Sequence, residues 1–222
     1  MTNIIFDLGG VLIDLDMPGC FKRVEALGVD MEAFSKASIT TGGSGATISE
    51  GITATGVMNL YQVGGVTTDE FIDDILSWCR AGTTPQQVID AWNSCLLTIP
   101  DYKLDYIKEL RRRGYHTYLL SNTNDLHWQH CLQSKFPEPI DHYFDHCFVS
   151  HEMQLAKPDI RIFQKVMETL KPSKTLKPSE TLFIDDCHTN CLAAEELGIR
   201  TFTTPVLYDW RQDVEKIAVN IA

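Results

Sequence analysis

The stretch Ile4-Ile5-Phe6-Asp7-Leu8-Gly9-Gly10-Val11-Leu12 decides how the rest of the chain is interpreted. A short apolar run with β-branched and aromatic residues leads into one acid and then two glycines, which is typical of a buried strand that ends at a turn. Asp7 would then lie at the carboxyl end of this strand, where open α/β sheets bind their ligands. A structural role for Asp7, capping the turn, is the alternative that this stretch alone leaves open.

The composition is that of an ordinary globular protein. The 222 residues are enough for one domain plus a sizeable insertion, and 44% are hydrophobic. A net charge of -11 argues against a nucleic-acid partner, which would require a basic surface.

The cellular setting is also predicted from the composition. Seven cysteines at irregular spacing do not suggest a disulfide framework. No signal peptide precedes the first strand, and no apolar run is long enough to cross a membrane. We therefore expect a cytoplasmic protein with no membrane partner, whereas the oligomeric state is not determined by the sequence.

Residues 16–95 have the pattern of a helical insertion. Apolar residues recur at helical spacing in segments that begin near Cys20, at Thr68 and at Pro85. Thr68, followed by two acids, is predicted to be a helix N-cap. The Gly-, Ser- and Thr-rich stretch 40–51 is predicted to be a loop, because it lacks the lysine of a phosphate-binding loop.

Strands and helices alternate in the remainder of the chain. Strands are predicted at residues 116–120, 144–149, 182–184 and 200–203, with amphipathic helices between them. This alternation favours a parallel sheet covered by helices on both faces, a Rossmann-like α/β fold. We predict a core domain of residues 1–15 and 96–222 and a helical cap domain of residues 16–95.

Polar residues follow several of these apolar runs. Ser121 and Asn122 end the second predicted strand, Lys157 precedes a Pro-Asp pair, and Asp185-Asp186 follows the fourth strand. Each has a structural alternative, such as an exposed lysine or acids at a helix N-terminus. His127 and His130 are spaced for metal binding, but no third ligand is evident.

The order of these groups resembles the haloacid dehalogenase-like hydrolase superfamily. Its four motifs correspond to "FDLGGVL", "LLSNT", "AKPD" and "FIDDCHTN", which extend from Asp7 to Asn190. Any one motif is weak, but four in order make a specific signal. The helical insertion between the first and second motifs matches the small α-helical cap of that superfamily.

The resemblance implies an enzyme that forms an aspartyl-phosphate on Asp7. A lysine and a divalent cation would neutralise the repulsion between the carboxylate and the phosphate, and Mg²⁺ suits an all-oxygen site. The implied metal site comprises Asp7, the backbone carbonyl of Gly9, Asp186 as a direct ligand, and Asp185 as a direct or supporting group. The remaining implied roles are phosphoryl binding by Ser121 and the amide of Asn122, a bridge from Lys157 to phosphate and nucleophile, and support of the metal site by Asn190.

Gly9 departs from the usual pattern of these phosphatases, most of which carry a second aspartate there as general acid and base. The metal contact survives because it uses the backbone, but the proton donor is lost. Asp14 or Asp16 could reach back as the acid, but both are predicted to belong to the connection toward the cap. Haloacid dehalogenases also lack this general acid. Unlike this chain, however, they have no acidic pair in the fourth motif.

A sugar-1-phosphate phosphatase branch resembles this chain in all of these features. We therefore expect a Mg²⁺-dependent phosphomonoesterase that acts on a small phosphorylated metabolite, a sugar phosphate, with a 1-phosphate favoured. The alternatives are a 2-haloacid dehalogenase and a catalytically inactive phosphate-binding or interaction module on the same fold.

Overall fold

The computed structural model describes residues 3–34, 47–48, 52–53, 56–170 and 177–219. A five-stranded parallel sheet with the order β5-β4-β1-β6-β7 forms its centre. The strands are β1 (Asn3–Phe6), β4 (His116–Ser121), β5 (His146–Val149), β6 (Thr181–Asp185) and β7 (Arg200–Thr203). The predicted α/β fold is therefore confirmed.

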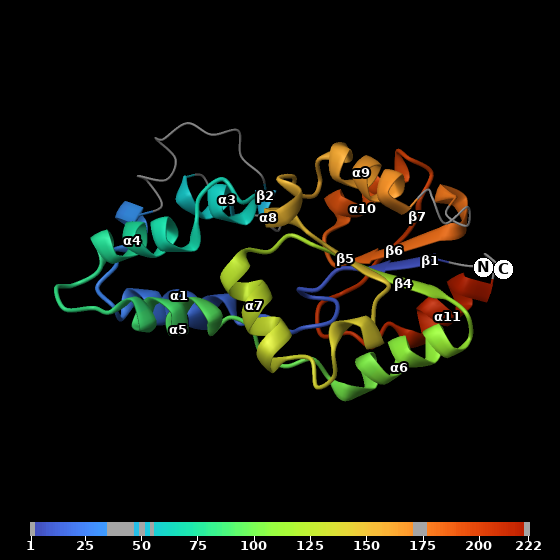
Figure 1. The fold of residues 1–222 in the computed structure, drawn as a ribbon, viewed down its shortest axis with the longest axis horizontal. Coiled ribbons are helices and arrows are strands. Elements are labelled where there is room, and N and C mark those ends of the chain that lie inside the picture. The colour runs from blue at the N-terminus through green and yellow to red at the C-terminus, as the bar shows by residue number, and fades with distance from the viewer. Residues whose placement is uncertain (1–2, 35–46, 49–51, 54–55, 171–176, 220–222) are drawn as a thin grey trace.

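Helices cover both faces of this sheet (Figure 1). One face carries α9 (Ile160–Leu170) and α10 (His188–Glu195), and the other carries α6 (Asp101–Arg112) and α11 (Arg211–Val219). Ile5 packs with Phe163 and Phe183 on the first face, whereas Phe6 packs with Trp210 on the second. Because successive strand residues point to opposite faces, a strand buried on both faces is a continuous apolar run.

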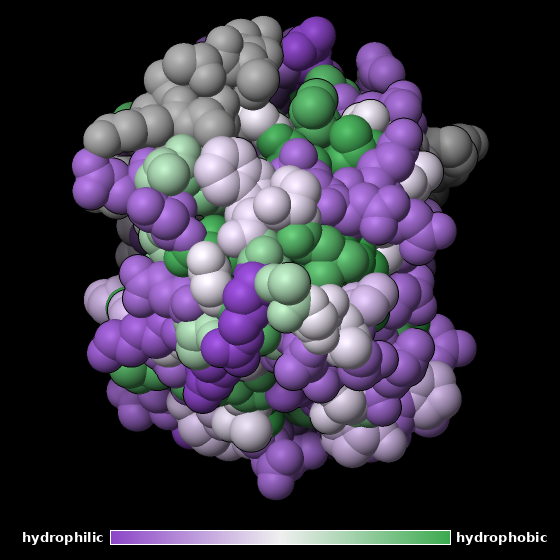
Figure 2. All heavy atoms as spheres, turned by 90° about the vertical axis from the view of Figure 1, so that its left-hand side faces the viewer, coloured by the Kyte–Doolittle hydropathy of each residue, from purple (hydrophilic) through white to green (hydrophobic). Residues whose placement is uncertain are grey.

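The inserted helical cap lies at one end of the sheet (Figure 1). It contains α1 (Met17–Glu25), the hairpin β2 (Thr47–Ile48) and β3 (Ile52–Thr53), α3 (Val57–Gln62), α4 (Thr68–Trp78) and α5 (Pro85–Asn93). The two connections to the core run side by side, since Asp16 N donates to Cys95 O (2.8 Å) and Leu97 N to Asp14 O (3.0 Å). Viewed from the cap, the surface is mostly hydrophilic with smaller hydrophobic patches (Figure 2).

The remaining elements lie in the connections between the strands. They are α7 (Asp125–Ser134) after β4, the short helices η1 (Ile140–His142) and α8 (Ser150–Met153), and η3 (Pro178–Glu180) before β6. In Figure 1, α7 lies between the sheet and the cap.

One predicted helix boundary is wrong. The N-cap of α4 is Thr67, not Thr68, because Thr67 and Glu70 form a reciprocal capping box. Apart from Thr47 and Ile48, the predicted loop 40–51 lies outside the described residues. The seven cysteines all lie in the described part and are free thiols. Within the described ranges, no helix is both long and apolar enough to cross a bilayer.

Candidate active site

The candidate site lies beside β1, where the order of the strands in the sheet reverses: β4 and β5 lie on one side of β1, and β6 and β7 on the other. Strand β1 is hydrogen-bonded to β4 on one side and to β6 on the other, with Phe6 opposite both Leu119 and Ile184. Asp7, which follows β1, is tied to β6 by a bond from its backbone N to Ile184 O (2.9 Å). Residues at the ends of three adjacent strands therefore converge at the kind of crevice where α/β proteins bind ligands.

Lys157 occupies the centre of this convergence and is fully buried. Its Nζ lies 2.9 Å from Asp7 Oδ1 and donates to Asp185 Oδ2 (2.6 Å) and Leu120 O (3.0 Å). Burial alone would lower the pKa of Lys157, but the carboxylates of Asp185 and Asp7 raise the pKa above its ordinary value. The lysine therefore stays protonated and has three acceptors for its three hydrogens.

The two carboxylate oxygens of Asp7 differ in their contacts. Its Oδ1 accepts from Leu8 N (2.7 Å) and faces Lys157, whereas Oδ2 has no hydrogen-bond partner in the described part of the chain. Burial raises the pKa of Asp7 well above its ordinary value; Lys157 opposes this shift, and Asp185 and Asp186 add to it. The carboxylate thus lies in an environment with an excess of negative charge.

The two acids of the fourth motif have different environments. Asp185 is fully buried, and its oxygens accept from Cys187 N (2.8 Å) and from Asn190 Nδ2 (3.0 and 3.1 Å) as well as from Lys157. Asp186 instead lines the cavity, and burial followed by repulsion from Asp185 raises its pKa to about 6. Asp186 is therefore the acid that faces a ligand.

Gly10 makes room for Asp186. A Cβ atom at Gly10 would clash with Asp186 Oδ2, and the φ of +73° at Gly10 disfavours other residues. The second glycine of the N-terminal stretch is thus required both for its conformation and for the approach of this acid.

The cluster has the composition of a site for a hard cation. Ligand oxygens of Asp7, Asp185 and Asp186 lie within 4.8 Å of one another. Lys157 supplies one positive charge against these three carboxylates. A closely spaced all-oxygen donor set with excess negative charge fits Mg²⁺.

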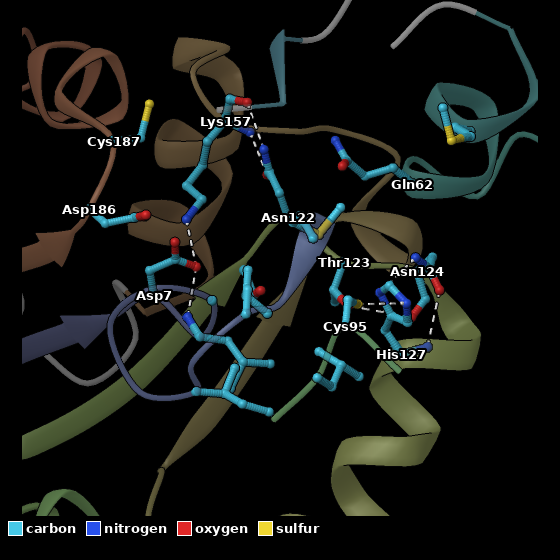
Figure 3. A pocket seen from close by; sticks show the side chains of 18 of the residues that line it. Asp7, Gln62, Cys95, Asn122, Thr123, Asn124, His127, Lys157, Asp186 and Cys187 are labelled. Carbon is cyan, nitrogen blue, oxygen red and sulfur yellow. Dashed lines mark hydrogen bonds and ion pairs between the residues drawn. The ribbon is translucent and has the colours of Figure 1, made fainter. Parts of the chain in front are cut away.

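The side chain of Asn122 binds the backbone of Lys157. Its Nδ2 donates to Lys157 O (2.8 Å), and its Oδ1 accepts from Lys157 N (2.8 Å). The carboxamide thereby fixes the backbone of Lys157 (Figure 3). Lys157 in turn bridges Asp7 and Asp185. Ser121 is 2% exposed and lines the cavity beside it.

A cavity of about 210 Å³ extends from this cluster into the space between core and cap. The predicted site residues that line it are Asp7, Gly9, Ser121, Asn122, Lys157, Asp186 and Asn190. Its wall also includes residues of the cap, among them Phe21, Met58, Gln62 and Trp92. The site is therefore built from both parts of the chain.

Comparison with known proteins gives the same family as the four motifs. A profile described as haloacid dehalogenase-like hydrolase matches residues 1–198. The chain belongs to the haloacid dehalogenase-like hydrolases. It is 33% identical, over 98% of both chains, to a D-ribitol-5-phosphate phosphatase of Bacteroides thetaiotaomicron.

Solved structures of this hydrolase family resemble the whole chain. A family enzyme of Bacteroides thetaiotaomicron, crystallised with magnesium and inorganic phosphate, is 36% identical, with a TM-score of 0.80 over 95% of this chain and 97% of that one. A predicted hydrolase of the family from Porphyromonas gingivalis is 31% identical, with a TM-score of 0.79 over 98% and 97%.

The motifs of this haloacid dehalogenase-like hydrolase did not reveal every residue of the cavity. Gln62, Trp92, Asn124 and His127 line it, and none was selected as a site residue from the sequence. Gln62 and Trp92 come from the cap, where the sequence shows only helical periodicity. The sequence suggests only a metal-binding role for His127, whereas its ring stacks on Trp92 with centroids 5.3 Å apart.

Proposed function

We propose that this chain is a Mg²⁺-dependent phosphomonoesterase that hydrolyses a small phosphorylated metabolite through a covalent intermediate on Asp7. The observation that carries the proposal is the buried Lys157, bound between Asp7 and Asp185 at one end of a ligand-sized cavity. The related ribitol-phosphate phosphatase and the structure with magnesium and phosphate support it.

The metal site follows from the oxygen cluster. Asp7, Asp186 and the carbonyl of Gly9 would hold Mg²⁺, and Asp185, which is already bonded to Lys157 and Asn190, would support them. The ion would supply positive charge that offsets the repulsion between Asp7 and the phosphoryl oxygens.

Each residue of the site would have a distinct role in the reaction. Asp7 Oδ2 attacks phosphorus, the bond from phosphorus to the ester oxygen breaks, and water then hydrolyses the aspartyl-phosphate. Lys157 lowers the pKa of Asp7 against the effect of burial and would neutralise charge on the phosphoryl group. The hydroxyl of Ser121 and the backbone amide of Asn122 would bind the phosphoryl oxygens.

The leaving oxygen takes its proton from water or from the substrate in this proposal. Gly9 has no side chain to donate one, so esters of more acidic hydroxyls should react faster. We therefore expect a preference for sugar 1-phosphates. The substrate named for the related phosphatase is a 5-phosphate, the ester of a primary alcohol.

Phosphate release from a panel of sugar and polyol phosphates, with Mg²⁺ and after chelation, tests the function. We expect turnover that depends on Mg²⁺. Chloride release from 2-chloropropionate without added metal would instead identify a dehalogenase, and no turnover of any ester would identify an inactive binding module.

Two further parts of the proposal concern the setting of the enzyme. We place it in the cytoplasm, which the seven free cysteines favour. We take residues 16–95 as the cap domain, because the two connections that flank this segment are paired with each other.

A further inference from the structure

The cavity has two chemically different ends. Its charged lining residues in the described part of the chain are Asp7, Lys157 and Asp186, and all belong to the phosphoryl end. The far end is lined by side chains that are apolar or neutral and polar: Phe21, Met58, Gln62, Trp92, Asn124 and His127. Among the residues that the structure describes, the part of a substrate that extends beyond the phosphate meets an uncharged wall.

Asn124 and His127, two of the polar residues at the far end, already form hydrogen bonds with each other and with the cap. Burial lowers the pKa of His127 to about 4, so its ring is neutral. Trp92 O can only accept, so His127 Nε2 carries the hydrogen and donates to it (3.2 Å). His127 Nδ1 then accepts from Asn124 Nδ2 (3.2 Å), and Asn124 Oδ1 accepts from His127 N (3.0 Å).

Gln62 is different because its donor is unused. It ends α3, is 6% exposed, and its Nε2 has no hydrogen-bond partner among the residues that the structure describes. Its backbone is fixed to the core, since Ser150 Oγ donates to Gln62 O (2.6 Å). Figure 3 shows its carboxamide extending from α3 toward Asn122, into the cavity.

An unused donor at this position favours a ligand acceptor. A buried amide hydrogen without a partner is destabilising, and a bound oxygen atom would recover that loss. Trp92 offers a second buried donor on the cavity wall, because its Nε1 also lacks a partner in the described ranges. Both donors are neutral, so they suit hydroxyl oxygens better than a second anionic group, which would lose its hydration without gaining a counter-charge.

We propose that Gln62 is the specificity-determining residue of this site: its Nε2 donates to a hydroxyl oxygen of the substrate's alcohol chain. Together with the uncharged wall it selects phosphate esters with a neutral, hydroxylated tail and rejects esters that carry a second phosphate or a carboxylate. The proposal rests on the proposed phosphomonoesterase function. A site built to bind a hydroxyl discriminates strongly against an analogue that lacks it.

The test compares three esters of the same chain length with Mg²⁺: ribitol 5-phosphate, pentyl phosphate without further hydroxyls, and 5-phosphoribonate with a terminal carboxylate. Wild type should prefer ribitol 5-phosphate to both others in kcat/KM. Gln62→Met, which keeps the length but removes the donor, should lower kcat/KM for ribitol 5-phosphate by about 10- to 100-fold. The preference over pentyl phosphate should shrink accordingly. Gln86→Met, on the exposed side of α5, is the matched control and should leave the preference unchanged.

The outcomes separate this inference from the function. If wild type hydrolyses an aryl phosphate and ribitol 5-phosphate but Gln62→Met keeps the wild-type preference, the role of Gln62 is refuted and the function stands. Equal turnover of 5-phosphoribonate and ribitol 5-phosphate by wild type would refute the selection against a second charged group, and this comparison needs no variant. If wild type hydrolyses no ester, the function and the inference fail together.

Discussion

At the residue scale, one buried lysine connects the chemistry of three motifs. Lys157 contacts Asp7 and Asp185, and Asn122 fixes its backbone. The sequence predicted these residues as a group because the order of the motifs is specific. It could not predict that the Asn122 side chain binds Lys157, since the two lie 35 residues apart and nothing local signals the pairing.

Asp7→Asn should abolish turnover and preserve the fold. The amide keeps the shape of the carboxylate but cannot form the acyl-phosphate, so kcat should fall by ~10³-fold or more. Phosphate release and thermal unfolding are measured side by side. Asp73→Asn, on the exposed side of α4, is the control. Wild-type phosphate release by Asp7→Asn would show that the reaction does not pass through this residue.

Asp186→Ala should weaken Mg²⁺ binding. Asp186 faces the cavity and is the less engaged member of the acidic pair. We expect the Mg²⁺ concentration for half-maximal activity to rise by at least about tenfold, with partial recovery at high Mg²⁺. The measurement is activity as a function of Mg²⁺ concentration. Activity indifferent to both the substitution and a chelator would remove the metal from the mechanism.

Gly9→Asp should supply the missing proton donor. A Cβ at Gly9 would meet Leu15 Cδ1 at 3.0 Å, the flexible end of a side chain, so the substitution can be accommodated. General acid catalysis contributes ~10²–10⁴-fold, and its absence costs most when the leaving alkoxide is basic. Wild type should hydrolyse glucose 1-phosphate with a higher kcat/KM than glucose 6-phosphate, and Gly9→Asp should narrow the gap. Equal or better turnover of the 6-phosphate by wild type would defeat the leaving-group argument.

At the scale of elements, local patterns predicted most of the core. Residues 200–203 form the predicted strand, and β4 and β6 extend the predicted strands by one or two residues. Apolar runs with clear stops account for this success. The boundary of α4 failed because Thr67 and Thr68 can both cap a helix, and the spacing of Thr67 to Glu70 decides between them.

Thr67→Ala should therefore destabilise α4, whereas Thr68→Ala should act on the contact between cap and core. Loss of the cap at Thr67 should lower the free energy of unfolding by about 1 kcal/mol. Thr68 Oγ1 instead donates to Asp125 Oδ2 (2.9 Å) on α7. Denaturant unfolding of both variants tests the assignment, which would be wrong if Thr67→Ala left the stability unchanged.

At the scale of the whole molecule, polar contacts hold the cap against the core. Leu126 N donates to Tyr61 Oη (3.0 Å), and His127 Nε2 donates to Trp92 O (3.2 Å). The sequence predicted a cap but not how it lies on the core, because these contacts join residues more than 30 positions apart. The sequence did not reveal the residues at the far end of the cavity for the same reason.

The neutral ring of His127 should make the stability of the molecule depend on pH. Burial lowers the pKa of His127 to about 4 in the folded protein, against about 6.5 in the unfolded chain. Between these two pH values the imidazole is protonated in the unfolded chain but not in the folded protein. The free energy of unfolding should therefore fall as the pH falls from about 6.5 to 4. Below about pH 4, His127 should cause no further decrease. Because the ring is only partly covered, we expect a contribution of ~1–3 kcal/mol.

The measurement is denaturant unfolding at pH 7.5, 5.5 and 4.5 for wild type, His127→Gln and His146→Gln. Other groups also titrate in this range, so the contribution of His127 is the difference between the pH dependence of wild type and that of His127→Gln. His127→Gln should show the shallower dependence, whereas the exposed His146 is the control and its substitution should leave the wild-type dependence in place. Equal pH dependence in wild type and His127→Gln would mean that folding does not lower the pKa of His127.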